Sequence, residues 1–171
     1  MSGSDSRIRV LGVDPGSMVC GWGVLDQIRG KTIHVDNGCI VGGRNESFHD
    51  RLNGIYLGIR EVIRRYGPDE TALEDTFFSH NVQSAIKLGQ ARGAAILAAV
   101  HEGLKIYEYP PAEVKNAVTG YGRAGKEQIS KMMKVLLCLP EVAAEDASDA
   151  LAVALCHLNS RRMTRVIARR G

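Results

Sequence analysis

The organisation of this chain is decided by residues 7–17, which read Arg-Ile-Arg-Val-Leu-Gly-Val-Asp-Pro-Gly-Ser. The apolar, β-branched run has strand character, and Asp14 stands where the run stops. Pro15 disfavours the helical region for the residue before it, so we expect Asp14 to stay extended while Pro15-Gly16 begins a turn. Such a run fits the middle of a sheet covered on both faces, where an ionised side chain is conspicuous. Asp14 is therefore either a turn-capping residue or part of a functional site.

Length and composition indicate one domain with a substantial core. The chain has 171 residues, of which 44% are hydrophobic and 24% charged, and its formal net charge of +3 permits a polyanionic partner without requiring one. We see no signal peptide and no membrane span, so we expect a soluble, cytoplasmic protein. We divide the chain into a disordered N-terminus (1–7), a single domain (8–160) and a basic C-terminal tail (161–171).

The four cysteines show no metal-ligand spacing, and their apolar or strand-like surroundings indicate reduced, buried thiols. They are Cys20, Cys39, Cys138 and Cys156.

The hydrophobic periodicity predicts an α/β fold in which the first three strands form an antiparallel meander. A right-handed crossover would then place the fourth strand beside the first, so that Asp14 and Glu74 become neighbours. Strands are expected at 8–13, 20–25, 32–41, 71–75 and 105–109, helices at 48–66, 81–103, 111–119, 125–139 and 146–159, and turns or bulges at Gly16, Gly21, Gly23, Gly30 and Gly38.

The helix expected at 81–103 is rich in small residues. Glycine within a helix costs about 1 kcal/mol relative to alanine, so Gly89 and Gly93 need an offsetting reason such as close approach by another backbone. Packing on the chain's own sheet explains one face of this helix, and a subunit interface is the alternative for the other.

Two further acids, Asp146 and Asp149, lie on one face at the start of the last helix. Acids at a helix N-terminus are ordinary, because they favour the positive end of the dipole. If this helix packs with its N-terminus at the edge that holds Asp14 and Glu74, however, four carboxylates converge. Each close pair would repel by about 4 kcal/mol at about 4 Å, so such a cluster needs cations. Carboxylate oxygens suit Mg²⁺ or Mn²⁺, and two such ions can drive in-line hydrolysis of a phosphodiester.

Four segments together resemble the RuvC family of crossover (Holliday) junction endodeoxyribonucleases. The likeness covers the chain from Ile8 to His157, in order and with similar spacing. The segments are Gly12-Val13-Asp14-Pro15-Gly16-Ser17, Leu73-Glu74-Asp75-Thr76-Phe77, Lys87-Leu88-Gly89-Gln90-Ala91-Arg92-Gly93 and Asp146-Ala147-Ser148-Asp149-Ala150-Leu151-Ala152.

The resemblance implies an RNase H-like fold, with a five-stranded mixed sheet and helices on both faces, in residues 8–160. It implies a homodimer that makes paired nicks in opposing strands of four-way junction DNA during recombination and repair, and a branch-migration complex of the RuvA–RuvB type is a further conceivable partner. The implied catalytic and metal-binding acids are Asp14, Glu74, Asp146 and Asp149, holding two Mg²⁺ ions per site that Mn²⁺ can replace. Some members carry His at the place of Asp146, and this chain keeps the carboxylate.

The expected DNA-binding residues are one aromatic and several basic side chains. Phe77 matches a family aromatic that stacks on unpaired bases, and Lys115 and Lys126 align with basic family positions. Each cation could equally sit on a solvated face, and the basic tail including Arg161 is more simply a frayed end. The full set is Phe77, Lys87, Arg92, Lys115, Arg123 and Lys126.

Two alternatives stay open, and a third is excluded. The chain could be another RNase H-like nuclease that acts on RNA or RNA–DNA hybrids, or a non-catalytic junction-binding protein. The second is disfavoured because a phosphate binder gains nothing from clustered negative charge. A nucleotide-binding module of the actin or sugar-kinase type also carries an Asp-containing glycine turn, but it requires two related domains and a second phosphate loop, for which this chain is too short.

Overall fold

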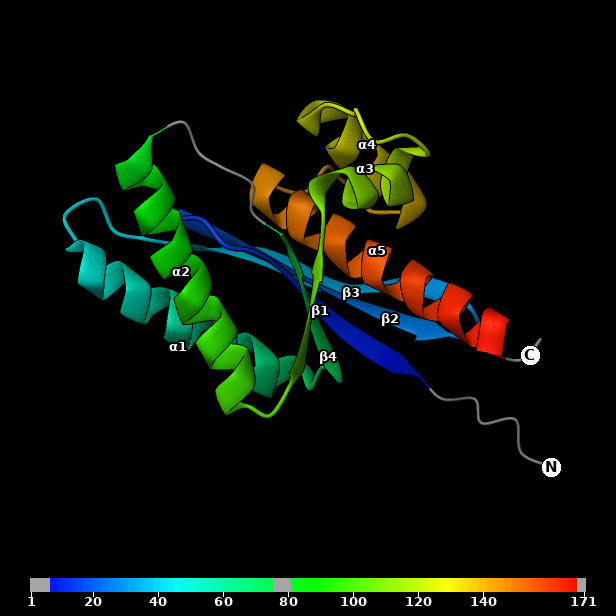
Figure 1. The fold of residues 1–171 in the computed structure, drawn as a ribbon, viewed down its shortest axis with the longest axis horizontal. Helices are drawn as coiled ribbons and strands as arrows, with labels where there is room; N and C mark the ends of the chain where they lie inside the picture. The colour runs from blue at the N-terminus through cyan, green and yellow to red at the C-terminus, as the bar shows by residue number, and fades with distance from the viewer. Residues whose placement is uncertain (1–6, 76–80, 169–171) are drawn as a thin grey trace.

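The fold is a five-stranded mixed sheet with helices on both faces (Figure 1). We describe a computed structural model covering residues 7–75 and 81–168. The strand order is β3-β2-β1-β4-β5, where β1, β2 and β3 form the predicted antiparallel meander and β1, β4 and β5 run parallel. The strands are β1 (Ile8–Asp14), β2 (Val19–Ile28), β3 (Lys31–Val41), β4 (Glu70–Glu74) and β5 (Lys105–Tyr109).

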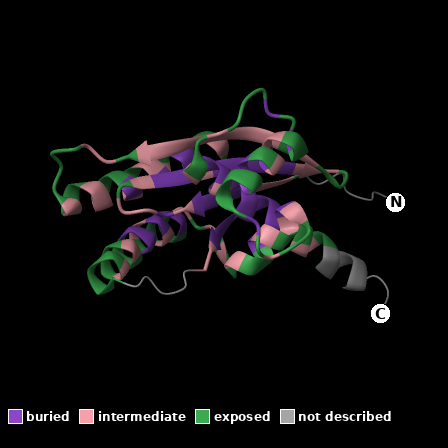
Figure 2. Ribbon diagram, turned by 90° about the horizontal axis from the view of Figure 1, so that it is seen from above, coloured by how far each residue is buried: buried purple, intermediate pink, exposed green. Residues whose placement is uncertain are grey.

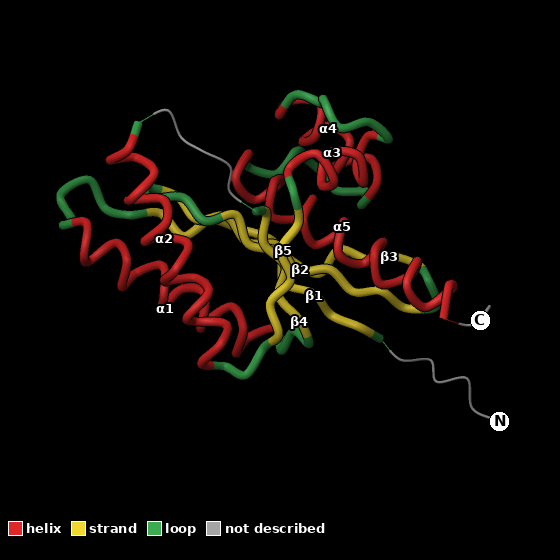
Figure 3. Tube along the Cα trace, viewed as in Figure 1, coloured by secondary structure: helices red, strands yellow, loops and turns green. Residues whose placement is uncertain are grey.

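The helices divide between the two faces of the sheet, α1 and α2 on one and α5 with α3 and α4 on the other (Figures 1 and 3). Each face has its own buried cluster, and β1 contributes to both by alternation: Val10 packs on the α5 side, and Leu11 and Val13 pack on the α1–α2 side. Figure 2 shows the buried residues concentrated on the strands and on the inner helix faces. The helices are α1 (Phe48–Tyr66), α2 (Val82–His101), α3 (Pro111–Thr119), α4 (Lys126–Leu136) and α5 (Glu145–Ala168).

Helix α1 illustrates how local sequence sets an element's ends. The Ser47 side chain accepts from Asp50 N at the start, and Gly67 closes the helix in the left-handed conformation with φ of 57°. These are the bounds that the periodicity predicts. Strand β4 begins three residues later, so only a short loop connects α1 to the sheet.

Several sequence-based expectations need correction. Gly21 and Gly23 lie inside β2 and Gly38 lies inside β3, and the register shift between these strands falls between Val24 and Leu25 rather than at a glycine. Gly30 does form a left-handed turn with φ of 78°. The last helix runs through residue 160 to Ala168, and Arg161 is not at a frayed end, because its guanidinium pairs with Glu70.

All four cysteines are free, but burial holds for only two of them. Cys20 and Cys156 are buried, Cys39 is half-buried and Cys138 is exposed. Among the residues that the structure describes, no helix is long and apolar enough to cross a membrane.

Candidate active site

The first two acids of the site lie at the ends of neighbouring parallel strands. Asp14 is the last residue of β1 and Glu74 is the last residue of β4, and the register pairs Val13 with Leu73 directly before them. Leu73 packs in the α1–α2 cluster and Ala72 in the α5 cluster, so alternation turns Glu74 toward α5. The same alternation turns Asp14 toward α5. The crossover predicted from the sequence therefore brings these two acids together.

Helix α5 brings its N-terminus to the same edge because glycines let it touch the strands. Gly21 stands opposite Asp14 in the β1–β2 register, and a Cβ atom on Gly21 would lie only 2.0 Å from the main-chain oxygen of Asp146. A Cβ atom on Gly12 would lie 1.9 Å from the main-chain oxygen of Ala150, one turn further along the helix. The main chain of α5 therefore rests directly on β1 and β2, with Asp146 next to the end of β1.

Burial, together with neighbouring negative charge, raises the pKa of three of these acids, Asp14, Asp149 and Glu74. Burial raises the pKa of Asp14 to about 7, with further contributions from the negative charges of Asp149, Asp146 and Glu74. Burial is also the main reason why the pKa of Asp149 rises to about 6, and it raises that of Glu74, to which the charge of Asp149 adds. Four acids from three elements thus share one electrostatic environment.

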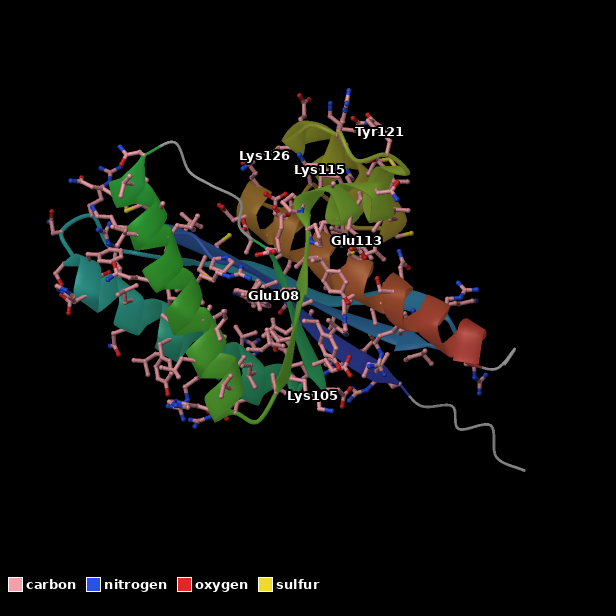
Figure 4. The ribbon with its side chains drawn as sticks, viewed as in Figure 1. Lys105, Glu108, Glu113, Lys115, Tyr121 and Lys126 are labelled. Atoms are coloured by element: carbon pink, nitrogen blue, oxygen red, sulfur yellow. The ribbon has the colours of Figure 1, made fainter. Side chains whose placement is uncertain are left out.

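Two lysines of the α3–α4 layer line this acidic edge. Lys126 Nζ lies 2.5 Å from Glu145 Oε1 and 3.9 Å from Asp149 Oδ2, and it lowers the pKa of Asp14. Lys115 acts in the same direction on the pKa of Glu74. Figure 4 shows Lys115 and Lys126 beside the N-terminal end of α5. These lysines offset part of the negative charge of the acids.

The donor set fits a divalent cation. All four side chains offer oxygen ligands, and the raised pKa values of Asp14, Glu74 and Asp149 reflect burial together with neighbouring negative charge that a cation would relieve. Within the described part of the chain, no three carboxylate, imidazole or thiol groups already form a ligand set for one ion. The acids share one edge of the sheet without being drawn around a common point.

The other predicted DNA-binding residues have different surroundings. Phe77 lies outside the described residues. Lys87 and Arg123 are exposed, and Lys87 Nζ lies 5.8 Å from the centroid of the Phe48 ring. Arg92 differs from these exposed cations: its side chain is only 10% exposed, and its guanidinium donates to the main-chain oxygen of Glu74 and to the carboxylate of Glu108, which favours an internal role over a DNA contact.

The sequence reasoning missed two features that shape the site, namely the contact of Gly12 and Gly21 with α5 and the internal role of Arg92. A glycine inside an apolar strand pattern was a usable signal for the first, since it also indicates close approach by another backbone. No sequence signal distinguishes a buried arginine in an alanine-rich helix from an exposed one.

Fold and site together define an RNase H-like α/β domain with a nuclease-type acidic edge. Comparison of sequences then identifies the family within this class of protein. The chain belongs to the RuvC family, because the family model described as crossover junction endodeoxyribonuclease RuvC matches residues 10–157.

Individual relatives agree with this family. The chain is 54% identical over 156 residues to the crossover junction endodeoxyribonuclease RuvC of Trichlorobacter lovleyi, covering 91% of this chain and 88% of the relative. It is 55% identical over 161 residues to that of Pelobacter propionicus, covering 94% and 92%. Among solved structures, T. thermophilus RuvC in complex with Holliday junction substrate matches with a TM-score of 0.84 and 34% identity, covering 92% of this chain and 96% of that one.

Proposed function

We propose that this chain is a structure-selective endonuclease that resolves four-way (Holliday) DNA junctions by paired hydrolytic nicks in opposing strands, in recombination and repair. The family membership supports this activity. The observation that carries it is the gathering of Asp14, Glu74 and the N-terminus of α5 at one sheet edge, where burial and the neighbouring negative charges raise the pKa of Asp14 and Glu74. A protein that only bound phosphates would gain nothing from this arrangement.

In this proposal Asp14, Glu74, Asp146 and Asp149 hold two Mg²⁺ ions, which Mn²⁺ can replace. The bound cations would supply a nucleophilic water and stabilise the leaving oxygen. The protein contributes the placement of these acids: the sheet register fixes Asp14 and Glu74, and the glycine contacts fix α5.

The basic rim would bind the DNA backbone. Lys115 and Lys126 stand beside the acids, and Lys87 and Arg123 are exposed on α2 and before α4. Contacts of this kind give affinity and salt dependence without reading sequence. Phe77 remains the proposed aromatic that stacks on unpaired bases.

A second copy of the chain would cover the outward face of α2. Gly89 and Gly93 have no atom within 4 Å of where a Cβ would be, so no other part of the described chain explains them. Large apolar residues share this stripe and are exposed, with Val82 at 73%, Ile86 at 57% and Leu97 at 48%. Two copies joined here would form the homodimer that paired nicks require. A branch-migration complex of the RuvA–RuvB type is a further proposed partner, to be tested by co-sedimentation.

The dimer is tested by sedimentation of the free protein. Gly93→Arg should give a monomer, whereas Gly54→Arg, at a glycine of α1 that is equally free of neighbours, should leave the dimer intact. A wild-type monomer at micromolar concentration would contradict the dimer.

The activity is tested with a synthetic four-way junction, in Mg²⁺ and in chelator. We expect wild type to cut only with Mg²⁺, and Asp14→Asn, Glu74→Gln and Asp149→Asn to bind the junction without cutting it. Glu127→Gln is a matched control, because Glu127 is exposed and its ion pair is with Lys131, one turn along α4. Cleavage by Asp14→Asn would show that Asp14 is not a catalytic acid. Faster cleavage of an RNA–DNA hybrid than of the junction would contradict the proposed substrate.

A further inference from the structure

Arg92 is the one charged side chain on the buried face of α2, a helix that the structure describes completely. The other buried residues of this helix are alanines, and Arg92 itself is only 8% exposed. Burying a guanidinium is costly unless acceptors surround it. Its partners therefore indicate what the residue does.

The guanidinium of Arg92 joins two strands at the point where both end. Its Nη1 donates to the main-chain oxygen of Glu74, and its Nη2 pairs with the carboxylate of Glu108 at 2.5 Å. Glu108, labelled on β5 in Figure 4, lies opposite Leu73 in the register. Both Leu73 and Arg92 are on the α1–α2 side of the sheet, whereas the Glu74 side chain turns to the α5 side. Arg92 thus contacts the main chain of Glu74 from the face of the sheet opposite to the one that the Glu74 carboxylate faces.

We infer that Arg92 is a positioning residue for cleavage, which fixes the main chain of Glu74 so that its carboxylate stays beside Asp14 and Asp149. This inference rests on the proposed function, since it takes Glu74 as a catalytic acid. Glu74 is the last residue of β4, so its carbonyl lies at the end of the sheet ladder and takes its hydrogen bond from α2. The positive charge of Arg92 also lowers the pKa of Glu74, against the larger rise caused by burial.

The geometry calls for arginine in particular. A guanidinium is a planar fork that can donate in two directions at once, whereas a lysine ammonium is a point charge on a flexible stem. Lysine at position 92 would keep the charge but would not hold Glu74 and Glu108 together as rigidly. Loss of a group that supports a metal ligand typically lowers metal affinity or activity by about 10- to 100-fold.

The experiment compares wild type with Arg92→Gln, Arg92→Lys and Glu108→Gln. Arg60→Gln is the matched control, because Arg60 makes an equivalent ion pair with Glu102 at 2.7 Å on the α1 side. Three quantities are measured: the single-turnover rate of junction cleavage against Mg²⁺ concentration, junction affinity in chelator, and Mn²⁺ binding by calorimetry without DNA.

We expect Arg92→Gln to weaken Mn²⁺ binding by about tenfold and to slow cleavage by about 10- to 100-fold, with junction affinity within about twofold of wild type. The Mn²⁺ affinity and cleavage rate of Arg92→Lys should lie between those of wild type and Arg92→Gln, and this variant carries the test if Arg92→Gln does not fold. Glu108→Gln should lose less, since its amide oxygen still accepts, and Arg60→Gln should match wild type.

Two results would overturn the inference. One is wild-type Mn²⁺ affinity in Arg92→Gln. The other is a loss of junction affinity with a shallower salt dependence, which would make Arg92 a DNA contact. If wild type binds Mn²⁺ but cuts no junction, the proposed function fails while the Mn²⁺ affinities still judge the role of Arg92. If wild type binds no Mn²⁺, both fail.

Discussion

Gly21→Ala should displace the start of α5 and disable the site without unfolding the protein. A Cβ at position 21 would lie 2.0 Å from the main-chain oxygen of Asp146, whereas real Cβ atoms essentially never come closer than 3.0 Å. The helix must therefore retreat by about 1 Å. Overpacking of this size costs about 1–3 kcal/mol, or roughly 2–4 °C of melting temperature per kcal/mol for a chain of this length. A misplacement of about 1 Å in a catalytic group can slow a reaction roughly 100-fold.

The assay combines thermal unfolding with single-turnover cleavage of a four-way junction at saturating Mg²⁺. Gly54→Ala is the control, since nothing lies within 4 Å of a Cβ there and alanine should stabilise α1 by about 0.5–1 kcal/mol without changing the rate. The reasoning is refuted if Gly21→Ala unfolds at the wild-type temperature and cuts at the wild-type rate, because α5 would then not rest on β2 as closely as described.

Three further predictions concern the rest of the fold. Burial lowers the pKa of His157 below 6.5, so the folded state binds fewer protons at this residue than the unfolded state does. The folded state therefore loses stability as the pH falls below about 6.5. The urea midpoints at pH 7 and pH 5 should differ less in His157→Gln than in wild type. Asp26→Ala should cost about 3 kcal/mol in urea unfolding, because Arg9 loses the two hydrogen bonds that it donates to the Asp26 oxygens at 2.7 and 2.8 Å and keeps the one to the main-chain oxygen of Tyr66. A loss under about 1 kcal/mol contradicts this. Lys126→Ala should reduce the slope of log affinity against log salt by about 1 in chelator, and an unchanged slope would remove it from the DNA surface.

The sheet and its two acids were predictable because strand rules are local. An apolar run that ends in Asp-Pro-Gly fixes where β1 stops, and a handed crossover leaves one place for β4. Alternation then decides which face each acid takes. Asp14 and Glu74 thus follow from two strands and one connection, without knowledge of the helices.

The position of α5 was not predictable in the same way. A helix N-terminus rich in acids is common, and only the absence of side chains at Gly12 and Gly21 lets this one lie against the strand ends. In the sequence, Gly21 fits a turn or bulge, and Gly12 inside a strand indicates close approach by some other backbone without saying which one. Arg92 shows the same difficulty: whether a cation faces DNA or a carbonyl depends on which face of α2 the tertiary packing buries.

Three different kinds of interaction hold the acids close together despite their repulsion. The sheet register holds β1 against β4 by main-chain hydrogen bonds, which ignore side-chain charge. Steric contact at Gly21 holds α5, and Arg92 holds the end of β4 from the opposite face. None of these uses the carboxylates themselves as partners. In the proposed function, the carboxylates of Asp14 and Glu74 would therefore be available to a cation, and the charge of that cation would in turn attract a phosphate.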